Sequence, residues 1–245
     1  MNLKKRIPEP EQEMEGYKEV KSFFEAHKKR RKKWDIYDLV SRDILKNIPI
    51  KRGKVLDVGC GYGGLMNQLS LYKKDLNFVG IDFSQAMIKL GKKLYGNKKM
   101  NFLYMSADNL RFKDDTFDAV VCKDTFHHFK NPVKVLKEMF RVLKKRGYIY
   151  VTDLRRDASE EIVYQTIQID SELNIENAIL YADSIRASYT IPEMKKMLKR
   201  AGIINYKTFE LKVGKNFLKD YKINKKYFLS ASNYRKDKWV LIIRK

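Results

Sequence analysis

The chain has 245 residues, of which 44% are hydrophobic, and its formal net charge is +22 at pH 7. This length suits one sizeable α/β domain with at most a small appendage. No apolar run approaches the roughly 20 residues of a membrane span, and no apolar stretch follows the N-terminal charges, so we expect neither a membrane protein nor a signal peptide. Cys60 and Cys122 are too few for a disulfide framework, which favours free thiols and a cytoplasmic location.

The basic excess has two explanations. A net charge of +22 predicts attraction to polyanions such as RNA, an anionic membrane surface or an acidic substrate. Lysine is, however, abundant along the whole chain, as in proteins of thermophiles or of AT-rich genomes, where the charge reflects composition. The second explanation is slightly favoured, and RNA stays open as a partner.

Residues 1–48 are expected to form a helical cap. Residues 1–10 contain two prolines and are predicted to be irregular. The apolar pattern from 11 to 47 is helical, and the basic block 28–33 divides it into two faces. A charge run of this kind is usually a solvated face, although it could also contact phosphates.

The next stretch, 54–65, predicts a buried strand that leads into a glycine-rich turn and a helix. Gly59, Gly61 and Gly64 satisfy the G-x-G-x-x-G spacing of a dinucleotide site. Asp57 argues against that ligand, because a carboxylate at this point would repel the pyrophosphate that such a helix N-terminus attracts. The same carboxylate suits a ligand that carries an ammonium and a sulfonium.

A second buried strand is predicted at 77–83 and contains Asp82 near its end. Asp82 lies about 20 residues beyond the glycine loop, where a carboxylate can accept hydrogen bonds from both hydroxyls of a ribose. Alternatively Asp82 could cap the next helix, but Ser84 is better placed for that role. A third strand and its exit loop are predicted at 100–110.

A fourth strand, 119–122, delivers the loop 123–129 to the carboxyl edge of the sheet, where α/β proteins bind ligands. His127 or His128 in this loop is a candidate general base, because imidazole titrates near neutral pH. Neighbouring histidines rarely face the same way, so at most one is expected to line the site. The alternative is a histidine at a helix start that is satisfied by backbone groups. With no third ligand nearby, no metal site is expected.

A fifth strand, 148–152, is followed by Asp153, Arg155 and Arg156. Asp153 is a candidate to activate a hydroxyl or to orient an amine, and the two arginines could grip a carboxylate or a phosphate. The alternatives, a helix cap for Asp153 and surface ion pairs for the arginines, are equally open.

The C-terminal part carries an insertion and the remaining strands. Residues 157–189 show two amphipathic helical patterns. A helix with a capping box is predicted at 190–200, and strands are predicted at 206–213 and 238–243. The segment 214–237 is expected to be a long connection over the sheet edge.

Residues 55–63 contain the pattern D-x-G-x-G-x-G and resemble motif I of the class I S-adenosylmethionine (SAM)-dependent methyltransferases. The wider pattern, over about residues 50–155, is similar to the methyltransferase type 11 branch, which includes ubiquinone- and menaquinone-biosynthesis-like enzymes. The resemblance implies an α/β fold with a doubly wound, Rossmann-like seven-stranded sheet of order 3-2-1-4-5-7-6. It also implies that 49–245 form the SAM-binding domain, that 1–48 cover the cofactor, and that 157–189 are a helical lid over the substrate site.

The resemblance also implies roles for individual residues. Those expected to bind SAM are Asp57, Gly59, Cys60, Gly61, Gly63, Asp82, Phe83, Ala107, Asp108, Asn109, Lys123 and, from the N-terminal helices, Tyr37. The acceptor pocket is expected among Tyr164, Tyr181, Arg155, Arg186 and Tyr189. The candidate catalytic residues remain His127, His128 and Asp153.

These features favour a SAM-dependent methyltransferase that transfers a methyl group to O, N or C of a small-molecule acceptor. The alternatives are a tRNA-modifying methyltransferase, a non-catalytic SAM-binding subunit and, more remotely, a dinucleotide oxidoreductase. The sequence lacks the signatures of enzymes that methylate base amines, cytosine C5, protein arginine or arsenite. The expected partners are the acceptor, with RNA as the alternative, and a second copy of the chain in a homodimer.

Overall fold

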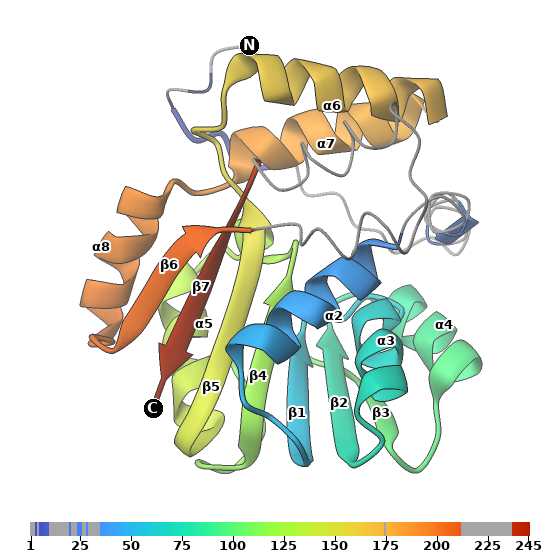
Figure 1. Cartoon of the computed structure of the whole chain (residues 1–245), viewed down its shortest axis with the longest axis vertical. Coiled ribbons are helices and arrows are strands. Elements are labelled where there is room, and N and C mark those ends of the chain that lie inside the picture. The colour runs from blue at the N-terminus through green and yellow to red at the C-terminus, as the bar shows by residue number, and fades with distance from the viewer. Residues whose placement is uncertain are drawn as a thin grey trace.

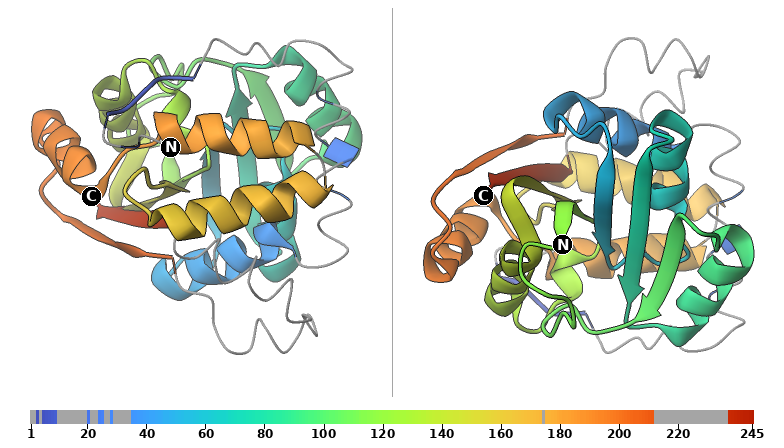
Figure 2. Two further views of the ribbon diagram at one scale, coloured as in Figure 1. Left: turned by 90° about the horizontal axis from the view of Figure 1, so that it is seen from above. Right: turned by 90° about the horizontal axis from the view of Figure 1, so that it is seen from below.

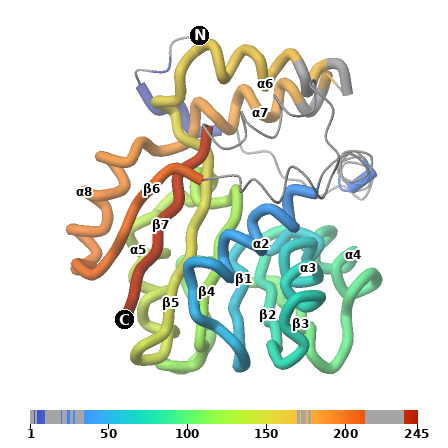
Figure 3. The backbone as a smooth tube through the Cα atoms, viewed as in Figure 1, coloured from blue at the N-terminus to red at the C-terminus, as the bar shows by residue number. Residues whose placement is uncertain are grey.

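The computed structural model describes residues 3, 5–9, 20, 24–25, 28, 35–173, 175–211 and 237–245. At its centre is a seven-stranded sheet with the order β3-β2-β1-β4-β5-β7-β6, which confirms the predicted order (Figure 1). The strands are β1 Gly53–Val58, β2 Leu76–Asp82, β3 Met100–Tyr104, β4 Phe117–Lys123, β5 Leu143–Leu154, β6 Tyr206–Glu210 and β7 Lys238–Arg244. Strands β1 to β5 are parallel, and β7 pairs antiparallel with both β5 and β6. The backbone trace shows β7 between these two strands (Figure 3).

Helices cover both faces of this sheet. They are α2 Ile36–Asn47, α3 Gly64–Tyr72, α4 Gln85–Tyr95, α5 Pro132–Val142, α6 Glu160–Leu173, α7 Ile175–Ala187 and α8 Ile191–Ala201, and η1 Phe126–His128 is a single 3-10 turn. Helices α2 and α3 bury their apolar stripes in one core, and α5 and α8 bury theirs in a second core on the opposite face (Figure 2). Two buried layers explain why β1 and β4 are almost continuously apolar.

Local sequence signals fix several helix ends. Ser84 caps α4, as predicted, because its hydroxyl accepts a hydrogen bond from the Met87 N–H at 3.2 Å. Thr190 and Glu193 form the predicted capping box at the start of α8. Gly202 ends α8 in the left-handed conformation with φ +76°.

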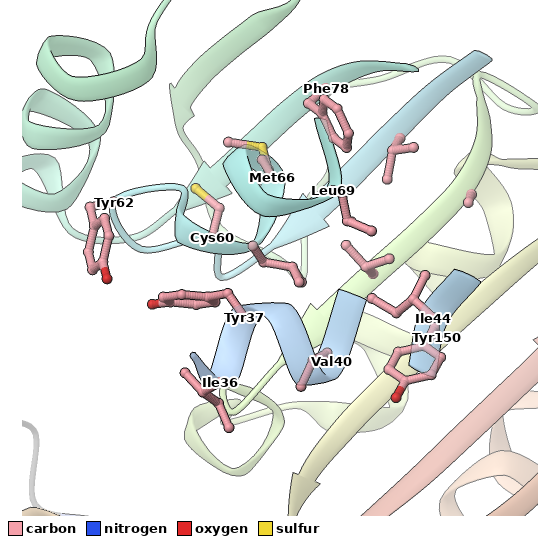
Figure 4. Packing of buried hydrophobic residues seen from close by; sticks show 14 of the residues in the cluster. Ile36, Tyr37, Val40, Ile44, Cys60, Tyr62, Met66, Leu69, Phe78 and Tyr150 are labelled. Carbon is pink, nitrogen blue, oxygen red and sulfur yellow. The ribbon is translucent and has the colours of Figure 1, made fainter. Parts of the chain in front are cut away.

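Helix α2 is the described part of the predicted N-terminal helices. Asp35 caps it by accepting a hydrogen bond from the Tyr37 N–H at 2.9 Å. Its apolar face packs against the sheet and α3, and Tyr37 points toward the glycine-rich loop, where its ring meets Tyr62 edge-on (Figure 4). Through this contact, helix α2 packs directly against the glycine-rich loop. The predicted basic block 28–33 lies outside the described residues except for Lys28.

Strand β5 differs from its predicted bounds. It begins at Leu143, directly after α5, and not at Tyr148. The pairing with β4 shifts register between Phe117 and Ala119, so the basic stretch 144–146, which precedes the predicted strand, forms a bulge within β5. Arg146 adopts φ +65° there. Strand β6 ends at Glu210, and residues 212–236, which include most of the predicted connection, lie outside the described residues.

The predicted insertion after β5 forms α6 and α7. The two helices lie side by side across the carboxyl ends of the strands in both the front view and the view from above (Figures 1 and 2). Leu154, Val163 and Ile185 belong to a third apolar cluster that joins these helices to the end of β5. None of the helices in the described parts of the chain has the length and hydropathy that a membrane crossing requires.

Candidate active site

The glycine-rich loop follows β1 at the carboxyl edge of the sheet. Gly59, Gly61 and Gly63 all have positive φ, at +71°, +53° and +86°. A Cβ on Gly59 would lie 2.1 Å from the Thr125 side chain, so this glycine allows the β4 loop to approach. A Cβ on Gly61 would meet nothing within 4 Å. The loop therefore packs tightly against Thr125 at Gly59, whereas the space beside Gly61 is free of atoms from the described residues.

Asp57 is a buried residue near the carboxyl end of β1. It is 2% exposed, and its Oδ2 atom has no hydrogen-bond partner. Burial raises its pKa to about 7, the Asp82 charge adds to this increase, and Lys123 opposes it. A buried carboxylate in this state is stabilised by any cation that reaches it.

Asp82 holds the glycine loop in place. Its Oδ2 accepts a hydrogen bond from the Gly61 N–H at 2.8 Å, and its Oδ1 accepts one from the Ser84 N–H at 2.9 Å. Burial raises the pKa of Asp82, although these backbone donors lower it. A carboxylate has about four acceptor positions, so the Asp82 oxygens can still accept further hydrogen bonds. The predicted contact with ribose stays a prediction.

The loops after β2 and β3 form an aromatic and polar rim. Phe83 is 66% exposed and stacks on Tyr104, with ring centroids 5.6 Å apart. Asp108 accepts a hydrogen bond from the Ser106 hydroxyl at 2.7 Å. Ala107 is buried, and the Asn109 N–H bonds to the Ser106 carbonyl. Four predicted cofactor residues, Phe83, Ala107, Asp108 and Asn109, are therefore carried on two adjacent loops.

Lys123 and Tyr37 lie close together beside the glycine loop. The Lys123 ammonium lies 5.1 Å from the centre of the Tyr37 ring and 2.6 Å from the Asp124 carboxylate. The Tyr37 ring packs so closely on Gly64 that a Cβ there would lie 2.4 Å from it. Helix α2 thereby brings Tyr37 to the loop, and its predicted contact with the cofactor stays a prediction.

Cys60 lies within the glycine loop. Its thiol is buried and donates a hydrogen bond to the Gly61 carbonyl at 3.3 Å. Burial raises its pKa well above the usual value, and the charges of Asp82 and Asp57 add to the increase. The thiol is consequently a packing group of low nucleophilicity.

His127 forms a buried dyad with Asp153. Its Nδ1 lies 2.6 Å from Asp153 Oδ1, and its backbone N–H donates to Asp153 Oδ2 at 2.8 Å. Burial alone would lower the pKa of His127, but the Asp153 carboxylate more than compensates and raises it. Asp153 is 1% exposed and also accepts a hydrogen bond from the Leu154 N–H, so it is neither a helix cap nor an open acceptor group. It positions His127, whose other ring nitrogen, Nε2, is buried and faces Glu9.

The two histidines face the same side, contrary to our expectation. Their ring centroids are 4.1 Å apart, and both rings approach Glu9. His128 Nδ1 lies 2.7 Å from one Glu9 carboxylate oxygen, and His127 Nε2 lies 3.6 Å from the other. The 3-10 turn η1 explains this, because successive side chains are turned by roughly 120° and do not alternate as in a strand. Sequence reasoning missed Glu9, which no local signal connects to residues 127–128.

The predicted acceptor arginines are engaged with protein groups. Arg155 pairs with Asp157 at 2.9 Å and with Glu210 at 2.5 Å, and these acids raise its pKa. Arg186 pairs with Asp183 at 3.0 Å. The structure thus matches the alternative of surface ion pairs for Arg155.

The predicted acceptor tyrosines do not gather at one place. Tyr164 on α6 is 67% exposed. The Tyr181 hydroxyl donates to Asp237 at 2.7 Å. Tyr189 belongs to the second core, and the Arg6 guanidinium lies over its ring at 4.3 Å. Burial raises the pKa of Tyr189.

Comparison with known proteins supports the interpretation of the glycine-rich stretch as a methyltransferase motif. Residues 56–151 match the family model described as a methyltransferase domain. The chain is 32% identical over 109 residues, 44% of its length, to phthiotriol/phenolphthiotriol dimycocerosates methyltransferase 1 of Mycobacterium ulcerans, and it covers 40% of that protein. It is also 32% identical over 151 residues, 58% of its length, to an uncharacterized protein of Methanocaldococcus jannaschii, of which it covers 61%. The chain thus spans less than two thirds of these relatives.

The fold has close structural counterparts. A protein of Methanococcus maripaludis described as a SAM-dependent methyltransferase superposes with a TM-score of 0.67 at 19% identity, with 96% of each chain covered. The sheet order and the domain match together show that the chain contains a class I SAM-dependent methyltransferase domain of the type 11 branch, as motif I predicts. SAM is the cofactor of that class.

Proposed function

We propose that this chain is a SAM-dependent methyltransferase whose acceptor is a small molecule, held between the carboxyl edge of the sheet and helices α6 and α7. The observation that carries the proposal is the buried Asp57 carboxylate, whose Oδ2 has no hydrogen-bond partner. It lies on the strand that leads directly into the open side of the glycine loop at Gly61. A ligand that brings positive charge to this point would offset the cost of burying Asp57.

SAM meets these requirements. Its ammonium and sulfonium are cations that Asp57 attracts, its ribose offers two hydroxyls to the remaining acceptor positions of Asp82, and its adenine can rest near Phe83. When bound, SAM supplies a methyl group already activated on a sulfonium. The protein then has to align the acceptor, exclude water and in some cases remove a proton, so no covalent nucleophile is required.

The acceptor side is supported by the His127–Asp153 dyad. Asp153 holds the Nδ1–H of His127, and the buried Nε2 atom is left without a hydrogen-bond partner. His127 is therefore the group that we assign to orient the acceptor heteroatom, with Asp153 as a positioning residue. The lid helices α6 and α7 supply the cover that excludes water, and η1 contacts α7 directly.

A tRNA acceptor is the second candidate, and the net charge of +22 favours it. Five basic residues, Lys51, Arg52, Lys144, Lys145 and Arg146, line a hollow at the amino-terminal edge of the sheet. A strand of six residues spans roughly 20 Å, so this hollow lies far from the glycine loop. It could anchor a phosphate backbone but would not present the reacting base.

A labelling experiment tests the proposal. Methyl-labelled SAM is incubated with the protein and cell extract, and the RNA, protein and small-molecule pools are separated. We expect label in the small-molecule pool, and its loss with the Asp57→Asn variant, which keeps the size of the side chain but not its charge. Label that enters RNA and disappears on ribonuclease treatment would replace this proposal by the tRNA alternative. SAM binding without label in any pool would indicate the non-catalytic subunit.

A further inference from the structure

The geometry points to a binding site for one divalent transition-metal ion, such as Zn²⁺, formed by Glu9, His127 and His128. One donor atom from each residue lies within 4.8 Å of the other two. Two imidazole nitrogens and one carboxylate are ligands that Zn²⁺ accepts in proteins, and three protein ligands leave a coordination position open. Nothing in the sequence predicts this set, because Glu9 joins the histidine pair only through the fold.

The distance between His127 and Glu9 fits an ion of this size, whereas the hydrogen-bonded His128–Glu9 pair would have to move apart to bind it. Donors bound at about 2.0–2.1 Å to a tetrahedral ion lie roughly 3.3–3.4 Å from each other. His127 Nε2 and Glu9 Oε1 are 3.6 Å apart, which is too long for a hydrogen bond and close to the required separation. His128 Nδ1 and Glu9 Oε2 are 2.7 Å apart, so an ion would replace the proton that now joins them.

A second observation is the state of His127. The residue is 3% exposed, and its Nε2 atom is buried without a hydrogen-bond partner. This atom faces Glu9, while the opposite ring nitrogen is held by Asp153 at 2.6 Å. A carboxylate on one imidazole nitrogen and an ion on the other is the usual arrangement around metal-binding histidines, because the carboxylate fixes the tautomer and the ring orientation. An unpaired buried imidazole nitrogen is costly unless something occupies its lone pair.

Glu9 is held in position by the rest of the fold. The Arg6 guanidinium donates to the Ala187 carbonyl at 2.6 Å and to the His127 carbonyl at 2.9 Å. The Ser184 hydroxyl donates to Glu9 Oε1 at 2.5 Å. The N-terminal segment is thereby fixed against α7 and η1, and Glu9 is 12% exposed. An ion here would join three parts of the chain that are distant in sequence.

The site lies at η1, in the loop that follows β4 at the carboxyl edge of the sheet. The charge of His128 is close enough to Asp82 to lower the pKa of that carboxyl. With an ion on His127 Nε2, the acceptor heteroatom would occupy the open coordination position of the ion in place of a direct contact with the imidazole nitrogen. This role rests on the proposed methyl transfer, whereas the metal site itself does not.

The competing explanation is an ion-pair cluster without metal. Burial would raise the pKa of Glu9, but His128 lowers it, and Asp153 raises the pKa of His127 against the effect of burial. An imidazolium between two carboxylates would also satisfy these groups. The two explanations differ in whether the apoprotein takes up an ion.

The test measures metal binding without SAM or acceptor, so it is independent of methyl transfer. The full chain is stripped with a chelator and titrated with Zn²⁺ alone by calorimetry, and with Co²⁺ alone by visible absorption. We expect one equivalent of Zn²⁺ to bind and the Co²⁺ complex to show the intense bands of a four-coordinate ion. Loss of a residue that only orients a metal ligand weakens metal binding by roughly 10- to 100-fold, so Asp153→Asn should weaken Zn²⁺ binding within that range. Glu9→Gln and His128→Gln remove ligands and should each weaken Zn²⁺ binding by more than this.

Two features keep the test decisive. Glu9 and His128 lie at the border of the core, with His128 48% exposed, so both variants should fold, and thermal unfolding followed by circular dichroism checks this. His27→Gln is the matched control, because His27 is the third of the three histidines in the chain. Failure of the wild-type protein to bind Zn²⁺ would overturn the proposal in favour of the ion-pair cluster. Unchanged binding in Glu9→Gln and His128→Gln would overturn it in favour of another site.

Discussion

The Asp82 carboxylate accepts a hydrogen bond from the Gly61 N–H at 2.8 Å, so the acid that ends β2 fixes the loop that follows β1. The residue expected to receive ribose therefore also shapes the loop that is expected to receive the rest of the cofactor. Ligand binding and loop order are coupled through this side chain, and loss of the carboxylate should affect both.

Asp82→Ala should weaken SAM binding by about 100-fold or more. Hydrogen bonds to a charged group contribute about 1.5–3 kcal/mol each, and two hydroxyls would lose their acceptor while the loop loses its support. Calorimetric titration with SAM measures the change. Ser84→Ala is the control, since it removes the cap of α4 and should cost about 1 kcal/mol of stability without changing SAM affinity. An unaltered affinity in Asp82→Ala would refute the ribose assignment.

Gly61→Ala and Gly202→Ala form a matched pair. Both glycines have positive φ, at +53° and +76°, and a Cβ at either position would meet no atom within 4 Å. Each substitution should therefore cost roughly 1–2 kcal/mol in backbone strain. Only Gly61→Ala places a methyl group where the cofactor is expected, so SAM affinity should fall in this variant alone. Equal SAM affinities in the two variants would remove the glycine loop from the cofactor site.

Asp57 should make the unliganded protein less stable as the pH rises from about 4 to 7. Its pKa is about 7 in the folded chain against a reference value of 3.8, so the native state binds more protons than the unfolded state in this window. The free energy of unfolding then decreases with pH, by at most about 4 kcal/mol from this group. Urea unfolding at pH 5 and pH 8 measures this effect.

Asp57→Asn should remove that pH dependence and gain stability relative to wild type at pH 8. The same variant should lose SAM affinity, because the amide carries no charge. Wild-type affinity for SAM should improve as the pH passes through about 7 and the carboxylate forms. If wild type and variant respond identically to pH, the carboxylate is not the titrating group.

Arg156→Ala and Arg155→Ala should differ in stability although the two residues are neighbours. Arg156 is 3% exposed and donates to the Ser188 carbonyl and to both oxygens of Glu193. Its removal should cost about 2–3 kcal/mol and loosen the junction between α7 and α8. Arg155 makes surface pairs, which contribute about 0–1 kcal/mol. Thermal unfolding measures both, and a loss of methyl transfer in Arg155→Ala at unchanged stability would return Arg155 to the acceptor site.

Local rules predicted the cofactor side of the molecule well. The strand, the glycine turn and the Ser84 cap depend on neighbours in sequence, and the sheet order followed from the family resemblance that those motifs carry. The contacts around the histidine pair could not be predicted, because they depend on pairs such as Glu9 with His128, which are 119 positions apart. Residue type alone also could not show that Arg155 and Arg186 are already paired with acids.

Strand β7 has a consequence for how the chain folds. It enters the sheet between β5 and β6, although both of these strands precede it in sequence. Until it arrives, β5 presents an unpaired apolar edge, which is prone to association with other chains. Lys238, the first residue of β7, also makes a 2.8 Å ion pair with Asp124 beside the glycine loop. The parallel strands β1 to β5 can therefore assemble early. Completion of the sheet, and of the ion pair at Asp124, must wait until Lys238 meets a residue 114 positions earlier in the chain. Because such distant contacts form slowly, we expect this step to limit the folding rate.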